Sequence, residues 1–382
     1  MNTTNVTRRA AWTAVAAVFA LNGVLFGMWV SRIPAVQAKL GLSHSALGIV
    51  LLFLGAGAVL AFPVTGRFID RFGAVTVTRI VATSCTLSVL LMGLAPNIYT
   101  LALALLIFGA FHGAVDVAMN AWGAEVERDF DRSMMSSFHA MWSLGAGLGA
   151  ISGALAVWAG LGVITHFTFG AVLFGSLTFV VARIPWESEK SEFSQSVLFA
   201  LPKGVLILVG LLSMCAAVGE GVVADWGAIY LRDVAGASES WAAIGFGSFS
   251  VAMVIVRLLG DALIRKFGPV ASARAGGACA TSGALLVLLA TAPVTGIVGF
   301  TLLGIGFAVI VPLAFSRAAN DPNIPPGQAL ASVATLGYGG MLLGPPIIGF
   351  VADLTSLRLS FILLFLLSAT ILLYAGALRR AD

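Results

Sequence analysis

The stretch GRFIDRFG, residues 66–73, separates two long apolar runs and is followed by Arg79. Glycines at both ends with three charged residues between them are typical of a short polar turn between two helices. A related stretch, DALIRKFG at residues 261–268, lies 195 residues further on, and Arg274 follows it at the same distance. The chain therefore contains an internal repeat, with one such loop in each half.

Two other pairs of landmarks keep the offset of 195 residues. GLSHS at residues 41–45 aligns with GASES at 236–240, and GAGLG at 145–149 aligns with GMLLG at 340–344. Three landmarks in different loops and apolar runs share one offset. Two halves in parallel orientation are the economical explanation, and transporters are known to have this arrangement.

The longest polar stretch of the chain falls near its middle, at residues 185–203. A polar segment between two repeated halves is typical of a linker. The sequence therefore predicts an N-terminal six-helix bundle over residues 1–184, a central cytoplasmic linker over 185–203 and a C-terminal six-helix bundle over 204–382.

The composition excludes a soluble globular protein. Of the 382 residues, 59% are hydrophobic and only 10% are charged, against about 25% charged residues in an average soluble domain. The mean hydropathy is +1.02. No polar stretch is long enough for a soluble catalytic domain, and no HExxH or GxSxG pattern is present, so we expect the chain not to be an enzyme.

The charge and the cysteines indicate neither nucleic acid nor a bound metal. The net charge of +4 comes in small clusters between apolar runs and not as one basic patch. The cysteines Cys85, Cys215 and Cys279 all lie inside apolar segments without CxxC spacing, which favours packed thiols. We expect no cofactor, no metal and no nucleic-acid partner.

Apolar runs of about 20 residues are long enough to cross a bilayer as helices. The chain contains twelve such runs, at 10–31, 45–66, 75–95, 99–123, 134–159, 162–183, 204–230, 241–264, 271–292, 294–317, 329–352 and 357–378. The sequence therefore predicts an all-α membrane protein with twelve transmembrane helices.

The positions of lysine and arginine predict the orientation of these helices. With twelve spans both termini lie on one side, and assigning that side to the cytoplasm places 17 of the 21 Lys and Arg residues inside. The four outside are Arg32, Lys39, Arg232 and Arg358. This bias follows the positive-inside rule and predicts a multi-pass protein of the cell inner (cytoplasmic) membrane with both termini cytoplasmic.

The loop at 66–73 resembles the GxxxDRxG signature of the major facilitator superfamily, and the twelve spans, the repeat and the central linker fit the same family. The resemblance implies two pseudo-symmetric six-helix bundles. It also implies that Asp70 caps a helix of the opposite half, and that Gly66, Arg71 and Gly73 belong to a gating loop. In the second copy Arg265 stands at the position of Asp70, so the resemblance is weaker there.

The glycine ladders at 145–149 and 340–344 permit close approach of helix backbones. They also resemble the GxxxGPxxGG pattern of exporters in the superfamily, although Ala150 stands where that pattern has proline. Close packing at the interface between the two halves is the simpler interpretation, and export stays open as an alternative.

The run FHGAVDVAMNAW at residues 111–122 contains Asp116 and Asn120, which lie on one helical face because they are four residues apart. The spacing resembles the ExxxN of fucose–proton symporter-like members, and the wider sequence is similar to the YbjJ-type branch near them. The resemblance implies that Asp116 carries a proton. A structural carboxylate paired with Arg128 or Arg132 is the alternative.

Two more ionisable residues are candidates for proton coupling, because charged side chains inside a membrane span are costly and are usually functional. His139 and Asp116 both lie roughly 12–14 Å from the cytoplasmic ends of consecutive helices, so the sequence permits their contact. Glu220 lies beyond the middle of the bilayer in the seventh span. For His139 an ordinary hydrogen-bonding role stays open.

Arg32 and Asp225 are candidates for a gate. Both lie near the outer surface on helices that the repeat relates to one another, and Asp225 aligns with Val30. Opposite charges at matched depth predict an ion pair that forms when the protein opens inward. Ordinary interfacial charges held in water are the alternative.

The sequence thus predicts a secondary active transporter of a small polar, sugar- or polyol-like solute, working as a monomer in the lipid bilayer by alternating access and proton-coupled symport. The expected substrate-binding residues supply stacking surfaces or hydrogen bonds; they are Asn22, Trp29, Asn120, Trp142, Trp226 and Tyr338. A proton-driven drug or metabolite efflux antiporter is the alternative within transport. A non-transporting membrane receptor or lipid-handling scaffold is the alternative from another class.

Overall fold

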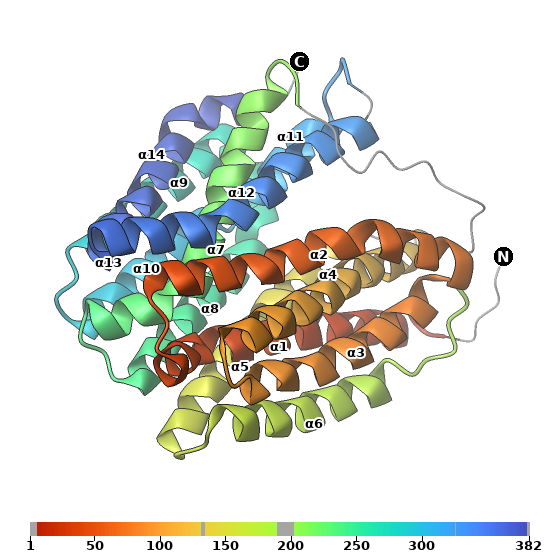
Figure 1. The fold of residues 1–382 in the computed structure, drawn as a ribbon. Coiled ribbons are helices and arrows are strands. Elements are labelled where there is room, and N and C mark those ends of the chain that lie inside the picture. The colour runs from red at the N-terminus through yellow and green to blue at the C-terminus, as the bar shows by residue number, and fades with distance from the viewer. Residues whose placement is uncertain (1–5, 131–133, 189–201, 325, 380–382) are drawn as a thin grey trace. The chain divides into compact units, whose positions relative to one another are not determined.

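The computed structural model describes residues 6–130, 134–188, 202–324 and 326–379, and all regular elements in these ranges are helices, as expected (Figure 1). The chain divides into two compact units. The N-terminal unit combines Met1–Leu42 with Val50–Gln195, and the C-terminal unit combines Ser43–Ile49 with Ser196–Asp382. The predicted linker at 185–203 lies mostly outside the described residues and stays a prediction.

The helices of the N-terminal half follow the predicted apolar runs. They are α1 (Arg8–Leu40), α2 (His44–Phe72), α3 (Ala74–Leu94), α4 (Ile98–Asp129), α5 (Met135–Trp158) and α6 (Val163–Val181). Local sequence explains their ends. Asn97 forms a capping box with Thr100 at the start of α4, and Gly41 ends α1 with a positive φ of 61° that suits glycine.

The C-terminal half contains more, shorter pieces than predicted. They are α7 (Leu206–Asp233), α8 (Glu239–Phe267), α9 (Pro269–Leu288), α10 (Pro293–Phe307), α11 (Ile310–Ala319), α12 (Pro326–Leu354), α13 (Leu357–Ser360), α14 (Ile362–Tyr374) and the 3₁₀ helix η1 (Ala375–Leu378). The single run predicted at 294–317 is divided into α10 and α11, and the run at 357–378 into α13, α14 and η1.

The break between α10 and α11 follows from a proline near the start of α11. Pro312 has no N–H and leaves the backbone carbonyl of Ala308, four residues earlier, without its usual helical donor. The Nε of Arg257 on α8 donates to this carbonyl at 3.4 Å. The proline thus leaves a carbonyl available, and Arg257 from another helix donates a hydrogen bond to it.

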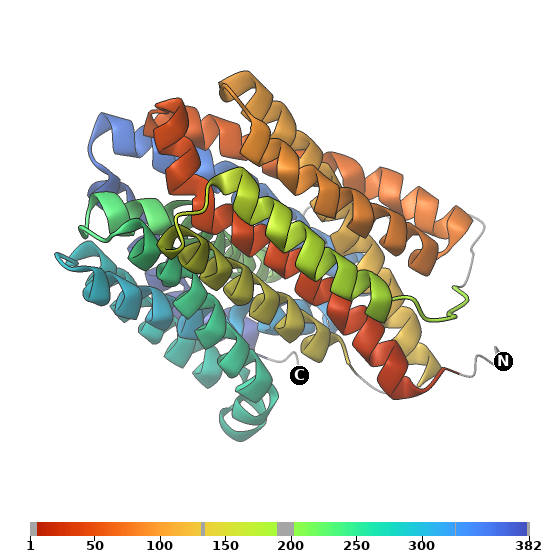
Figure 2. The same ribbon diagram turned by 90° about the horizontal axis from the view of Figure 1, so that it is seen from below.

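The same helix pairs recur in both units, as the repeat of 195 residues predicts. In the N-terminal unit α1 packs on α5, and α3 packs on α4 and α6. In the C-terminal unit α7 packs on α12, and α9 packs on α10 and α14. Figure 2 shows α1 in red and α6 in light green side by side in the N-terminal unit. Helices α1 and α7, which the repeat relates, are the most buried spans. Of the residues in their apolar stretches, 83% and 67% are buried.

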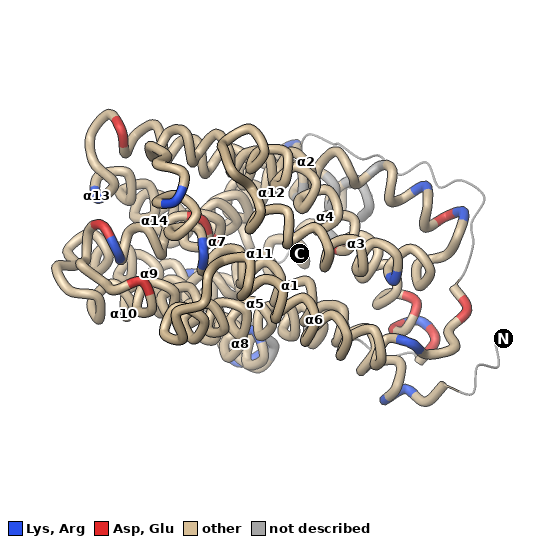
Figure 3. The backbone as a smooth tube through the Cα atoms, turned by 60° about the horizontal axis from the view of Figure 1, so that its bottom comes forward, with Lys and Arg blue, Asp and Glu red and all other residues tan. Residues whose placement is uncertain are grey.

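The described residues contain eleven helical spans that are long and apolar enough to cross a membrane; α10 and α11 together form one of them, and α13, α14 and η1 another. The helix α9 is present at the position of the ninth predicted span but is not among these eleven; it contains Arg274 besides several Gly and Ser residues. The expectation of twelve spans is therefore not confirmed, whereas the multi-pass membrane class is. Most charged residues lie near helix ends (Figure 3).

Candidate functional site

One face of α4 carries three polar residues at intervals of four, His112, Asp116 and Asn120. The side chain of Asn120 donates from Nδ2 to the backbone oxygen of Asp116 at 2.8 Å and to its carboxylate Oδ1 at 3.2 Å. This is the contact that the four-residue spacing predicts. The face lies in the middle and second half of a long apolar helix, where polar side chains are costly.

The ring of His112 is stacked between two phenylalanines. Its centroid lies 5.5 Å from the ring of Phe26 on α1 and 5.6 Å from the ring of Phe108 on α4. Phe26 also contacts Trp142 of α5, with ring centroids 5.9 Å apart. Three helices of the N-terminal unit thus supply aromatic rings beside the polar face of α4.

Asn22 lies on the same face of α1 as Phe19 and Phe26, because it comes three residues after Phe19 and four before Phe26. Phe19 contacts the ring of His139 on α5 at 5.3 Å, edge to face. The side chain of Asn22 is only 1% exposed, and neither its amide nitrogen nor its oxygen has a hydrogen-bond partner among the described residues. An unsatisfied buried amide costs about 1–3 kcal/mol, which is unusual enough to require an explanation.

These residues form one group, which we name the polar–aromatic cluster. It combines hydrogen-bonding groups and rings from α1, α4 and α5, all inside the N-terminal unit; its members are Phe19, Asn22, Phe26, Phe108, His112, Asp116, Asn120, His139 and Trp142. Four of the predicted site residues on α4 and α5 belong to it. Direct contact between Asp116 and His139 stays a prediction.

The close packing of α1 on α5 explains the first glycine ladder. A Cβ on Gly145 would lie 2.1 Å from the backbone oxygen of Ala20, and one on Gly149 would lie 2.2 Å from that of Val24. In the C-terminal unit a Cβ on Gly340 of α12 would lie 2.4 Å from the side chain of Met214 on α7. The contacts of Gly145, Gly149 and Gly340 therefore pack helices inside each unit, and packing of the ladders between the two halves stays a prediction.

Two further predicted residues lie near the second half of α1. Trp29 is fully buried, and its Nε1 has no hydrogen-bond partner among the described residues. Arg32 is 4% exposed and donates from Nη2 to the backbone oxygen of Leu161 at 3.0 Å. A charged side chain this deeply buried is expensive unless it is compensated. The role of Arg32 in a gate stays a prediction.

The C-terminal unit contains an ion pair between Glu220 of α7 and Arg257 of α8, with 3.4 Å from Oε1 to Nη2. Glu220 lies near the middle of α7, and both side chains are largely buried. Arg257 is also held by the carbonyl of Ala308 that Pro312 leaves without a helical donor. The pair thus joins α7, α8 and the break after α10.

The other predicted residues of this unit lie on α7 and α12. Trp226 is fully buried, with its Nε1 unpartnered among the described residues, and its ring lies 6.0 Å from that of His44. Asp225 precedes it and makes no hydrogen bond or ion pair inside its unit in the described part of the chain. Arg32 belongs to the other unit, so the predicted gate stays a prediction. The side chain of Tyr338 lies outside the described residues.

The loop predicted as a gate joins α2 to α3. Gly66, Asp70 and Arg71 lie in the last turns of α2, and the guanidinium of Arg71 lies 5.2 Å from the ring centre of Phe72. Gly73 is the N-cap residue before α3 and has a φ of 85°, and a Cβ there would lie 2.7 Å from the Cβ of Ser188. Glycine is therefore required at 73 both by its conformation and by the close approach of Ser188.

Sequence reasoning missed two polar residues of these groups, His112 and Arg257, and three rings of the cluster, Phe19, Phe26 and Phe108. His112 was visible as the residue one turn before Asp116, on the same face of the helix. Arg257 was counted only as part of the positive-inside bias, because no periodicity shows that it points at Glu220.

Comparison with known proteins identifies the family of the chain. The model of the Major Facilitator Superfamily matches residues 11–323. The chain is 44% identical to a Sinorhizobium fredii protein named "Uncharacterized transporter y4wD", over 97% of this chain and 98% of that protein. It is 33% identical to a Yersinia pestis protein named "Uncharacterized MFS-type transporter", over 95% of this chain and 94% of the relative.

A solved structure shares the fold. The crystal structure of the nucleoside transporter NupG superposes with a TM-score of 0.73, at 14% identity, over 96% of this chain and 98% of NupG. At that identity the likeness supports the fold alone. The family match covers most of the chain, and each of the two relatives covers nearly all of it. The chain therefore belongs to the Major Facilitator Superfamily and is a transporter of that family.

Proposed function

We propose that this transporter is a secondary active symporter, which moves a small polar, sugar- or polyol-like solute across the cytoplasmic membrane together with protons. The observation that carries the proposal is the buried, unpartnered amide of Asn22 in the polar–aromatic cluster. An amide offers donors and an acceptor side by side, which suits neighbouring hydroxyl groups of a polyol. A bound solute would satisfy it and remove its desolvation cost.

The rings of the cluster suit the rest of such a solute. Binding sites for small molecules are mostly apolar and contain a few placed polar groups. Trp142 and Phe26 supply apolar faces for the C–H surface of a sugar ring, and Asn120 adds a second amide. Trp29, Trp226 and Tyr338 remain proposed contributors from the rest of the chain.

Proton coupling is proposed for Asp116, His139 and Glu220. Ionisable groups inside membrane spans often form proton relays. Asp116 carries a carboxylate beside Asn120, and the pair resembles the ExxxN of fucose–proton symporter-like members, to whose YbjJ-type branch we assign this chain. Glu220 has Arg257 as a partner that stabilises its charged form and is released when the acid takes up a proton.

Reconstitution into proteoliposomes tests this function. The full chain is purified, and a panel of sugars, polyols, organic acids and nucleosides is screened by thermal shift. Hits are then tested for counterflow and for uptake driven by an inward proton gradient. We expect a sugar or polyol to accumulate, and an uncoupler to abolish accumulation while exchange continues.

Three outcomes would contradict the proposal. If the solute moves only in the direction opposite to the protons, the protein is an efflux antiporter. Transport of another solute class from the panel, with no response to sugars or polyols, would overturn the substrate class. Absence of counterflow for every ligand that binds would favour a receptor or scaffold.

A further inference from the structure

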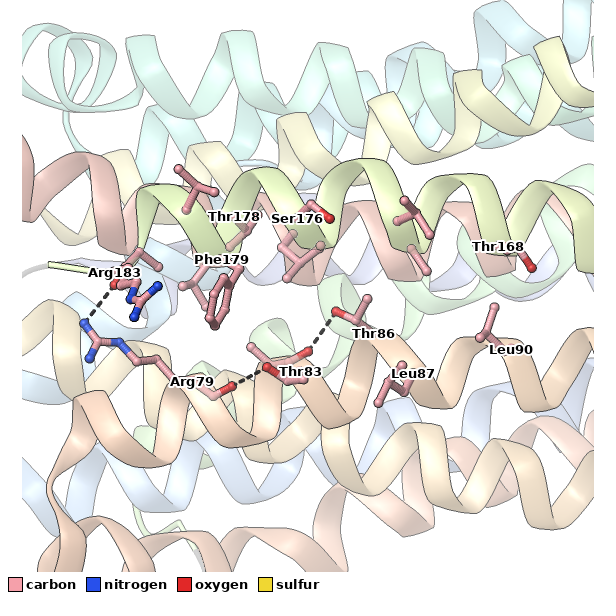
Figure 4. A pocket seen from close by; sticks show the side chains of 18 residues that line it. Arg79, Thr83, Thr86, Leu87, Leu90, Thr168, Ser176, Thr178, Phe179 and Arg183 are labelled. Carbon is pink, nitrogen blue, oxygen red and sulfur yellow. Dashed lines mark hydrogen bonds between the residues drawn. The ribbon is translucent and has the colours of Figure 1, made fainter.

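A groove of about 420 Å³ lies between α3 and α6 of the N-terminal unit, apart from the polar–aromatic cluster (Figure 4). The groove is lined mainly by apolar atoms, and the rest of the protein leaves several of its large apolar side chains uncovered. Leu87 on α3 is 61% exposed, and Val172 and Phe179 on α6 are 63% and 56% exposed. On helices that cross a membrane, such side chains face the acyl chains of lipids.

Three threonine hydroxyls in this groove donate within their own helices, and that of Thr178 on α6 donates to the backbone oxygen of Ala17 on α1 at 3.5 Å. Thr83 donates to the backbone oxygen of Arg79 and Thr86 to that of Ala82, each at 2.8 Å. Thr168 donates to the oxygen of Ile164 at 2.8 Å. These residues present methyl groups to the groove, so its length suits a hydrocarbon chain better than a polar solute.

One end of the groove carries two arginines, Arg79 near the start of α3 and Arg183 just after α6 (Figure 4). Arg79 donates from Nη2 to the backbone oxygens of Ala182 at 2.9 Å and Ile184 at 2.5 Å, and its buried Nε has no hydrogen-bond partner among the described residues. Arg183 is exposed, and its guanidinium lies 5.8 Å from the ring centre of Phe179.

Neither arginine forms an ion pair with any described residue. Two neighbouring positive charges without an acidic partner repel each other, and an anion between them removes this repulsion. Because α3 begins and α6 ends there, this charge lies at the edge of the membrane, at the level of lipid headgroups. The positive-inside bias assigns that edge to the cytoplasmic leaflet, which holds anionic lipids.

We propose that the α3–α6 groove binds an anionic phospholipid, with its phosphate at Arg79 and Arg183 and one acyl chain along Leu87, Val172 and Phe179. A guanidinium suits a phosphate because it presents several N–H donors in a planar fork. The apolar walls hold the chain by burial of its surface. This site is independent of the transported solute and of the proton path.

Native mass spectrometry of the full chain in detergent tests the charged end. Dioleoyl-phosphatidylglycerol and dioleoyl-phosphatidylcholine are compared, because they share acyl chains and differ in net charge. We expect the wild type to retain phosphatidylglycerol preferentially, and Arg183→Gln to weaken its binding about fivefold. Arg9→Gln is the control, because this substitution removes the same charge at an exposed arginine of α1 that lies outside the groove.

A second pair of variants tests the groove itself and does not depend on the arginines. Val172→Trp fills the groove, whereas Leu173→Trp adds the same side chain at the next position, which is equally exposed but does not line it. We expect only Val172→Trp to lower phosphatidylglycerol binding.

The outcomes that overturn the proposal are distinct. Equal retention of the two lipids by the wild type excludes a headgroup site. Equal losses in Arg183→Gln and Arg9→Gln would show that overall surface charge attracts the lipid. Equal losses in Val172→Trp and Leu173→Trp, or no loss in either, would exclude the groove, and this holds even if the arginine variant fails to fold.

Discussion

The carboxylate of Asp353, near the end of α12, caps the first turn of α2 at His44. Its Oδ1 accepts from the backbone N–H of His44 and lies 3.2 Å from the Nδ1 of that ring, while Oδ2 accepts from the N–H of Ser45 at 2.9 Å. The two residues are 309 positions apart in sequence. A carboxylate at a helix N-terminus is stabilised by free N–H groups and by the helix dipole.

The cap predicts the local stability of α2. Asp353→Ala should raise amide exchange of residues 44–50 about fivefold, because losing an N-cap costs about 1 kcal/mol. Asp353→Asn is the control, since an amide oxygen still accepts from the helix N–H groups. Hydrogen–deuterium exchange with mass spectrometry measures both. Unchanged exchange in the alanine variant would show that Asp353 does not hold this helix.

Proton coupling is tested at Asp116. Asp116→Asn should abolish accumulation of solute against a gradient while leaving exchange of solute largely intact, because the amide keeps the shape and hydrogen bonding but does not titrate. Uptake and counterflow in the same proteoliposomes measure the two activities, and exchange serves as the internal control. A variant that still concentrates solute would place the coupling elsewhere.

Asn22 should show opposite effects on stability and transport. Asn22→Leu removes a buried, unsatisfied amide, so the empty protein should become more stable by up to about 1–3 kcal/mol, while solute binding is lost. Thermal melting with and without solute measures the first effect, and counterflow measures the second. Ser88→Ala is the control, because Ser88 is equally buried but its hydroxyl already donates to Cys85. A destabilised Asn22→Leu with normal transport would remove Asn22 from the site.

The Glu220–Arg257 pair should be strongly coupled. Arg257→Ala leaves a buried carboxylate without its partner and should cost about 3–5 kcal/mol of stability, whereas Glu220→Gln with Arg257→Ala should cost less than the two separate effects added. Thermal melting of the four proteins gives this double-mutant cycle. Arg232→Ala is the control, because its pair with Asp233 is more exposed and should contribute at most about 1 kcal/mol. If the losses of stability in the two single variants add up to the loss in the double variant, the two residues are not coupled.

The proposed gate is tested by labelling. If Arg32 and Asp225 pair when the transporter opens inward, Arg32→Ala should shift the protein outward-open and increase labelling of a cavity cysteine from the periplasmic side. Arg32→Ala with Asp225→Ala should add little to the single change, because the interaction is already lost. If the two changes act additively, the residues are not partners, and Arg32 is better assigned to the solute.

Local sequence patterns determined the class of this protein. Apolar runs long enough for a bilayer, the offset of 195 residues and the loop at 66–73 were sufficient to predict an all-helical membrane protein of the major facilitator superfamily. The contact of Asn120 with Asp116 followed from helical spacing alone. These features depend on composition and on the period of the helix, which one chain displays without neighbours.

The tertiary structure decided which helices supply partners to one another. It placed His112 between Phe26 and Phe108, and it brought Arg257 to Glu220 across 37 residues. It also placed the glycine ladders against helices of their own unit. Such contacts depend on which helix faces pack together, and that choice is made by the shape and volume of side chains distant in sequence, for which a single chain shows no period.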